Sequence, residues 1–268
     1  MVEEAQTPEM HLKQLEQMTR KSKREEKPTE QVVETEKKSW KDESREERRE
    51  REDKEKLESW VPKTELGKQV KSGKIKNIQE IFDSGRKILE PGIVDTLLNL
   101  KVELLNTGQA KGKFGGGKRR PWKQTQKKTK EGNIATFSVL AVVGDGNGYI
   151  GIGSGRASET LPAKEKAIRK AKLNIIKIKR GCSSFDCSCD EMHSIPLKTE
   201  GKCSGVKVIL MPAPQGSGLV IGDEMKKILK LAGIKDIYSK TFGPTRTTVN
   251  TAKACMDALT KLENYKLE

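Results

Sequence analysis

Three cysteines and one histidine are the residues of this sequence whose types and spacing point most directly to chemistry. They are Cys182, Cys187, Cys189 and His193, spaced C-x4-C-x-C-x3-H, with Cys203 beyond them. Thiolate and imidazole are ligands that zinc prefers, but this spacing is not the paired C-x2-C of common zinc knuckles. Two interpretations stay open: a structural zinc site, or reduced cysteines that are partly buried. The sequence offers no Cys-His-Asn set with a substrate pocket, so we do not expect a protease.

A run of basic residues gives a second chemical signal. Residues 111–130 hold nine lysines and arginines and no acidic residue, with Phe114 and Trp122 among them and four glycines that disfavour regular structure. Like charges at this density repel one another unless a polyanion neutralises them, and aromatic rings can stack on bases. A solvated loop is the alternative, but we favour contact with phosphates. The candidate RNA-binding residues here are Lys118, Arg119, Arg120, Lys123, Lys127 and Lys128.

Two glycine patterns resemble nucleotide-binding motifs, and both fail in their context. Gly146, Gly148 and Gly151 fit G-x-G-x-x-G, which binds a dinucleotide only where a strand leads into a helix, and here a strand leads into another strand. Residues 112–119 fit the P-loop up to its last position, where Arg119 replaces the Ser or Thr that coordinates magnesium. A P-loop nucleotide hydrolase therefore stays only a weak alternative, and we assign no catalytic residue.

Residues 139–155 hold two strand-like runs around an Asp-Gly-Asn-Gly turn, which is a strong hairpin signal because tight turns need φ > 0. Gly151, Gly153 and Gly155 alternate along the second run, so one strand face lacks side chains and something must approach its backbone closely. In a chain this basic we expect a sugar-phosphate backbone there. Valine at Gly151 or Gly153 should then leave the fold intact and block assembly. A neighbouring helix against the bare face is the open alternative.

Hydrophobic periodicity predicts an α+β protein of two small domains. In the first, a polar strand at 124–130 joins the hairpin in a three-stranded sheet, and a basic helix from Pro162 to about Lys177 packs on it. The inward stripe of this helix is Ala163, Ala167, Ala171 and Ile175. A basic helix beside a hairpin loop can straddle the grooves of duplex RNA and read shape instead of sequence.

The second domain follows a β-loop-α-β-loop-α pattern. Its predicted elements are a strand at 206–211, a helix at 224–232 capped by Asp223, a strand at 234–240 and a last helix capped by Thr247. Three short helices are expected before the basic run, at 64–73, 78–84 and 92–100. Thr64 and Asn77 can cap the first two, and Pro91 suits the first turn of the third.

Composition favours a nucleic-acid partner. The 268 residues include 53 Lys and Arg against 38 Asp and Glu, a net charge of +15. Residues 1–58 have a net charge of −3 and predict a mostly disordered or transiently helical extension, so the remainder holds +18 and would attract a polyanion. A membrane is not expected, because no apolar run approaches about 20 residues and no signal peptide opens the chain. The odd number of cysteines, five, indicates reduced thiols or a metal site in the cytoplasm.

Several of these segments together resemble the small-subunit ribosomal protein five family. The shared motifs are Val143–Gly148, the Gly151/Gly153/Gly155 strand, Lys172–Ile176 and Pro212–Gly218. Further segments resemble its archaeal and eukaryotic branch: Trp60–Thr64, Ile93–Asp95, His193–Pro196 and Thr245–Asn250. The resemblance covers about residues 60–262. Residues 1–58 have no counterpart in the family, and the segment near 111–122 looks like an insertion relative to the family.

The resemblance implies a structural, non-enzymatic protein of the cytoplasmic ribosome. It implies two domains, one similar to double-stranded-RNA-binding folds and one α/β. With composition and periodicity, the expected segments are an extension at 1–58, helices and the basic loop at 59–122, the first domain at 123–190 and the second at 191–268. The resemblance also implies binding to 16S-type rRNA, contact with small-subunit protein four and other small-subunit proteins, nearby mRNA at the point where it enters the subunit, and support of translational accuracy. No small-molecule substrate and no certain cofactor are expected. A free-standing duplex-RNA-binding regulator is the alternative.

The remaining site residues are expected from the motifs and the resemblance together. Candidate RNA contacts outside the basic run are Asn147, Gly148, Gly151, Gly153, Arg156, Lys164, Arg169, Arg180 and Arg246. Gly216 and Gly218, in the loop after Pro212, are candidates for a contact with another protein.

Overall fold

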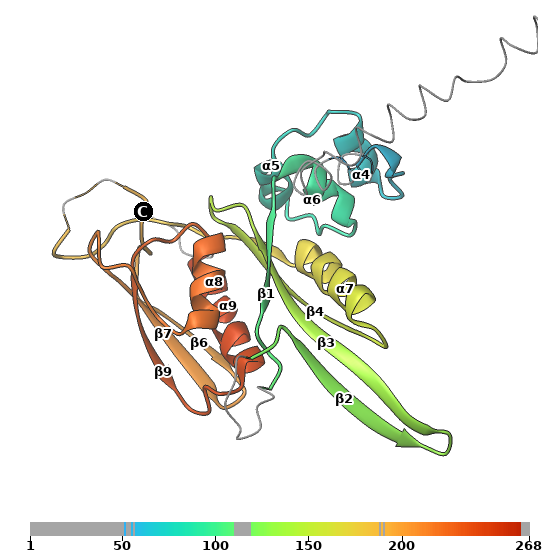
Figure 1. Ribbon diagram of the computed structural model, residues 1–268. Helices are drawn as coiled ribbons and strands as arrows, with labels where there is room; N and C mark the ends of the chain where they lie inside the picture. The colour runs from blue at the N-terminus through green and yellow to red at the C-terminus, as the bar shows by residue number, and fades with distance from the viewer. Residues whose placement is uncertain are drawn as a thin grey trace, which may run out of the picture. The chain divides into compact units, whose positions relative to one another are not determined.

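The computed structural model describes residues 51, 55, 57–109, 119–187, 189 and 191–263 (Figure 1). The chain divides into two compact units, Met1–Trp60 and Val61–Glu268. The predicted extension at 1–58 falls almost entirely outside the described residues, as do Lys118 and the glycine-rich part of the basic run. The helices and strands labelled in Figure 1 all belong to the second unit.

Three short helices open the second unit: α4 (Glu65–Lys71), α5 (Ile78–Asp83) and α6 (Pro91–Leu97). Thr64 caps α4 as predicted, because its Oγ1 accepts a hydrogen bond of 3.1 Å from the main-chain N–H of Gly67. Asn77 holds the cap position of α5 as predicted, but its side chain makes no capping hydrogen bond. Helix α6 ends before the predicted Leu100, because the chain from Lys101 onward pairs with a sheet.

The first sheet has five strands, β1 (Lys101–Leu105), β2 (Trp122–Thr129), β3 (Gly132–Gly144), β4 (Tyr149–Ala157) and β5 (Ile175–Lys177). Its order is β1-β3-β4-β5, all pairs are antiparallel, and β2 follows β1 along the same edge of β3. Both predicted hairpins, β2–β3 and β3–β4, are therefore present. Helix α7 (Thr160–Leu173) covers one face of β3 and β4 (Figure 1).

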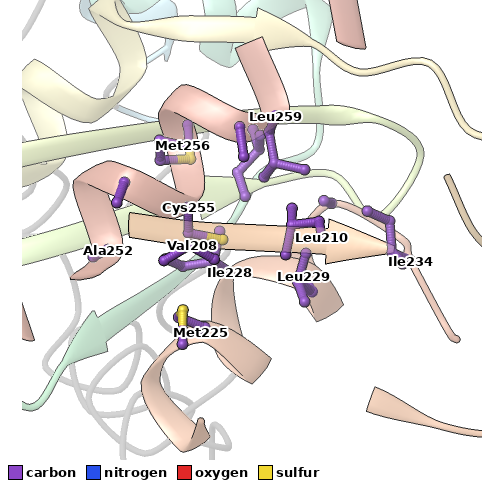
Figure 2. Packing of buried hydrophobic residues seen from close by; sticks show 14 of the residues in the cluster. Val208, Leu210, Met225, Ile228, Leu229, Ile234, Ala252, Cys255, Met256 and Leu259 are labelled. Carbon is purple, nitrogen blue, oxygen red and sulfur yellow. The ribbon is translucent and has the colours of Figure 1, made fainter. Parts of the chain in front are cut away.

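The second sheet has four strands, β6 (Thr199–Cys203), β7 (Val206–Pro212), β8 (Leu219–Val220) and β9 (Ile237–Phe242). Its order is β6-β7-β9-β8, and only β8 and β9 are parallel. Helices α8 (Asp223–Leu231) and α9 (Thr248–Glu263) pack on it. Figure 2 shows Val208 and Leu210 of β7 among Met225 and Ile228 of α8 and Cys255 of α9, in one apolar cluster.

Strand β3 is buried on both faces where the first sheet is wide. Leu140 and Val142 belong to the large core that α8 and α9 also fill, whereas Val139 and Ala141 pack with Ala163 of α7. Alternation with a period of two sends successive side chains to opposite faces. The first sheet thus lies between α7 on one face and α8 with α9 on the other, which fixes the position of the hairpins at its ends.

The mixed α+β class is confirmed, but several predicted bounds are wrong. The basic helix ends at Leu173 instead of Lys177, because residues 175–177 pair with β4. Asp223 is the first residue of α8, and Gly222 holds the cap position. Strands β1, β5, β6 and β8 are missing from the prediction, because short strands without clear alternation owe their conformation to the strands they pair with. Across the described ranges, no helix is both long and apolar enough to span a membrane.

Candidate functional site

The β2–β3 hairpin, residues 122–136, forms a basic arm that extends beyond the rest of the first sheet (Figure 1). The pairing of β3 with β4 begins only at Phe137, so the arm is a single layer of two strands. Lys123, Lys127 and Lys128 are exposed on it. Because neighbouring side chains of a strand point to opposite faces, the arm carries cations on both of its faces.

Helix α7 begins beside the base of the arm, since Ala157 of β4 pairs with Phe137 and the helix starts at Thr160. Three alanines form its buried stripe, and its outward cations are Lys164, Lys166, Arg169 and Lys170. Arg156 is also exposed, and its Nη2 donates a hydrogen bond of 2.9 Å to Oγ1 of Thr136 in the arm. The structure therefore brings the predicted residues of the arm, of β4 and of α7 to neighbouring parts of the surface.

The glycine face of β4 does not meet solvent, and the expectation that it meets an RNA backbone is wrong. Gly151, Gly153 and Gly155 are buried against α7, where an added Cβ would overlap main-chain atoms of the alanines at 163, 167 and 171. A backbone does lie close against these glycines, as their spacing predicts, but it is the backbone of helix α7 and not of RNA. Gly151 and Gly153 are therefore packing residues and not RNA contacts.

The Asp-Gly-Asn-Gly turn is held by its own residues. Oδ1 of Asp145 accepts hydrogen bonds from the main-chain N–H of Asn147, at 2.7 Å, and of Tyr149, at 3.0 Å. Asn147 is exposed at the tip, as an RNA contact requires. Gly148 is buried and has φ of 109°, a backbone conformation that favours glycine. Its role is to form the turn, and its prediction as an RNA contact is wrong.

Arg180 has a structural part that its sequence context does not predict. Its guanidinium donates to the main-chain oxygens of Gly146 at 3.4 Å, of Asn147 at 3.1 Å and of Gly233 at 3.2 Å. The main-chain N–H of Gly146 also donates to the oxygen of Leu231, at 2.9 Å. Arg180 thus fastens the hairpin turn to the end of α8.

A basic cleft of about 940 Å³ lies where the turn meets α8. Among the residues that the structure describes, its charged lining is Arg180, Lys226, Lys230, Lys235 and one acid, Glu191. Sequence reasoning missed the three lysines, because only the packing of the turn on α8 brings them beside Arg180. Four cations around a concave surface can hold phosphate oxygens in place.

The other predicted contacts lie at the second sheet. Arg119 and Arg246 are both exposed, and Nη1 of Arg119 donates to the main-chain oxygen of Arg246 at 3.4 Å, so the start of β2 lies beside the loop before α9. Arg120 is exposed next to it. In the loop after β7, Gly216 is exposed with φ of 87°, and Gly218 has φ of 69°. These candidates stay predictions.

The structure gathers the predicted metal ligands into one cluster. The four candidate ligand atoms of Cys182, Cys187, Cys189 and His193 all lie within 4.8 Å of one another, and Cys203 is outside this group. Sγ of Cys187 is 3.0 Å from Sγ of Cys189 and 3.7 Å from Nε2 of His193. The cluster could hold a metal ion.

The two neighbouring thiols of the cluster are not equivalent. A hydrogen bond from Cys189 lowers the pKa of Cys187 to about 6, and the same interaction raises the pKa of Cys189 to about 11. Cys255, in the core of the second sheet, is fully buried, and burial raises its pKa to about 12. The cluster therefore offers a thiolate near neutral pH, whereas Cys255 stays a protonated core side chain.

Comparison with known proteins agrees with the resemblance drawn from the motifs. The family description "Ribosomal protein S5, N-terminal domain" matches residues 122–179, and "Ribosomal protein S5, C-terminal domain" matches residues 201–268. Small ribosomal subunit protein uS5 of Nanoarchaeum equitans is 51% identical over 213 residues, which are 79% of this chain and 91% of that protein.

Two other archaeal relatives with the same name are similar over a comparable length. The protein of Staphylothermus marinus is 49% identical over 206 residues, 76% of this chain and 89% of its own length. That of Methanocaldococcus jannaschii is 46% identical over 207 residues, 77% of this chain and 88% of its own length. With matches to both domains and at this level of identity, the chain belongs to the ribosomal protein S5 family, in its archaeal form.

Proposed function

We propose that this chain binds 16S-type rRNA of the small ribosomal subunit through the basic arm and the outward face of α7. Membership of the S5 family makes it a structural protein of the small subunit and not an enzyme. The observation that supports the binding surface is the set of exposed cations on the arm and α7. Neighbouring ion pairs occupy other lysines, such as Lys172 with Asp95 at 2.6 Å.

The arrangement suits duplex RNA. A small sheet with one helix on its face, similar to double-stranded-RNA-binding folds, can place helix cations and a hairpin on successive grooves. Lys164 and Arg169 on α7 and Lys123 and Lys127 on the arm would neutralise phosphates, which fixes position without reading sequence. The basic cleft beside Arg180 offers a further place for the RNA backbone, and Asn147 of the turn also lines it.

The interactions with proteins are a separate part of the proposal. The family resemblance implies small-subunit protein four as a neighbour. The loop that contains the exposed Gly216 and the half-buried Gly218 is its proposed binding segment. Translational accuracy and a position near incoming mRNA are proposed on the same resemblance. A free-standing RNA-binding regulator is disfavoured by membership of a ribosomal family, and a nucleotide hydrolase by Arg119 at the position where a P-loop needs a hydroxyl.

The salt dependence of rRNA binding tests the arm. Each lysine–phosphate interaction that is removed should reduce the slope of log K against log salt by about 0.9, so Lys123→Ala with Lys127→Ala should reduce it by about 1.8. The matched control is Lys207→Ala with Lys261→Ala, because these lysines already pair with Glu200 and Asp257 at 2.7 and 3.6 Å. Equal slopes for the two double variants would contradict the proposed binding surface.

A further inference from the structure

We propose that Cys182, Cys187, Cys189 and His193 bind one zinc ion as a closed, structural site. None of these four residues belongs to the basic arm or to α7. All four side chains come from one short segment, residues 182–193, which lies between the two sheets in the sequence and lacks regular helix or strand at its described positions. A structural zinc site uses four protein ligands and leaves no open position, and Cys3His is one of its usual ligand sets.

The distances fit a tetrahedron. With zinc bonded to sulfur at about 2.3 Å and to nitrogen at about 2.0–2.1 Å, neighbouring ligand atoms lie about 3.5–3.8 Å apart. The separation of Cys187 Sγ and His193 Nε2, 3.7 Å, already matches, and all four atoms lie within 4.8 Å. The two sulfurs of Cys187 and Cys189, 3.0 Å apart, are beyond the length of a disulfide bond, about 2.05 Å, and a shared ion would separate them slightly.

The histidine is held for ligation through Nε2. Its side chain is only 1% exposed, and Nδ1 lies 2.8 Å from Oδ2 of Asp236, although the two atoms are not aligned as a linear hydrogen bond. Asp236 is itself fixed, because its Oδ1 accepts a hydrogen bond of 2.7 Å from the main-chain N–H of Gly218. A carboxylate behind the far nitrogen of a ligating histidine sets the tautomer and orients the ring toward the metal.

The main chain supports the same arrangement. Gly181 and Ser194 form an antiparallel bridge with hydrogen bonds of 3.0 and 3.1 Å, which closes the segment into a loop. Nε2 of Gln215, in the loop after β7, also donates a hydrogen bond of 3.4 Å to Oε2 of Glu191. A bound ion would therefore join the 182–193 loop to the loop after β7 and to the start of β9.

The test is metal content of the full chain, purified without a histidine tag under reducing conditions. About one zinc per chain is expected in the unaltered protein and in Cys203→Ser, the matched control, whose cysteine lies outside the cluster. Cys187→Ser and Cys182→Ser should retain less than about a tenth of an equivalent. Stoichiometric zinc in both ligand variants, or no zinc and no uptake in the unaltered chain, would overturn the proposal.

Two further measurements keep the test decisive if a ligand variant fails to fold. Cobalt added to the unaltered chain should give the intense visible bands of a tetrahedral thiolate site, and weak octahedral bands would contradict it. Asp236→Asn keeps all four ligands and should weaken zinc binding by about 10–100-fold. An unchanged affinity would remove Asp236 from the site. An intact mass lower by two hydrogens, with no metal, would show a disulfide in its place and overturn the proposal.

Discussion

Strand β3 passes through two regions that differ in burial: its second half lies in the core and its first half is partly exposed in the basic arm. In its second half, residues 139–144, side chains are buried on both faces, and the backbone of β4 lies directly against α7. In its first half, within the basic arm, it has one partner, β2, and exposed cations surround it. We expect substitutions in the buried half to reduce stability. If the arm binds rRNA as proposed, substitutions there should reduce binding instead.

The largest expected effect is at the glycine face. Gly153→Ala places a Cβ onto main-chain atoms of Ala167 and Ala171, which cannot yield as a flexible side chain would. We expect a loss of about 3 kcal/mol or more in the free energy of unfolding, at or above the top of the usual range for overpacking. Urea denaturation measures it.

The neighbouring exposed residue supplies the control for that change. Ser154→Ala should alter the free energy of unfolding by no more than about 0.5 kcal/mol, because Ser154 points away from α7. If Gly153→Ala unfolds at the same urea concentration as the unaltered chain, the packing of α7 on β4 is wrong and the RNA-facing interpretation of the glycines returns.

Substitutions of two arginines, one half-buried beside the end of α8 and one exposed near the arm, test the same comparison with a smaller expected change in stability. Arg180→Ala removes three hydrogen bonds to main-chain oxygens that join the turn to α8, and should lower the free energy of unfolding by about 2 kcal/mol. Arg156→Ala removes one exposed bond to Thr136 and should stay within about 0.5 kcal/mol while weakening rRNA binding. Thermal melting and rRNA binding, measured on both variants, separate the role of Arg180 in stability from that of Arg156 in binding. Equal destabilisation by the two substitutions would contradict this difference in roles.

The sequence contains a signal for the glycine face that motif reasoning overlooked. Glycines two apart on a strand repeat every 6.6 Å or so, and alanines four apart on a helix repeat every 6 Å or so. The series Gly151/Gly153/Gly155 and Ala163/Ala167/Ala171 therefore match in spacing and in small size, which predicts that the two elements pack on each other. The basic composition of the chain instead favoured an RNA backbone as the partner of the glycine face.

Other features had strong local signals or none. The hairpin turns, the cap at Thr64 and the amphipathic helices follow from residue types within one turn or one strand, so the sequence predicts them. The sequence does not predict the partners of His193 and Arg180. Asp236 and the end of α8 are distant from them in sequence and meet them only after the sheets pack. The ligand set of the cluster was found by residue type, and its supporting carboxylate was not.

Chemical labelling of lysines can show whether the basic arm meets rRNA in the assembled subunit. The full chain, free and assembled in small subunits, is exposed to an amine-reactive reagent, and the modification of each lysine is read by mass spectrometry. We expect Lys123, Lys127, Lys128 and Lys164, all exposed in the chain, to become protected on assembly far more strongly than the already paired Lys207. Arm lysines that react as readily in the subunit as in the free chain would contradict this expectation.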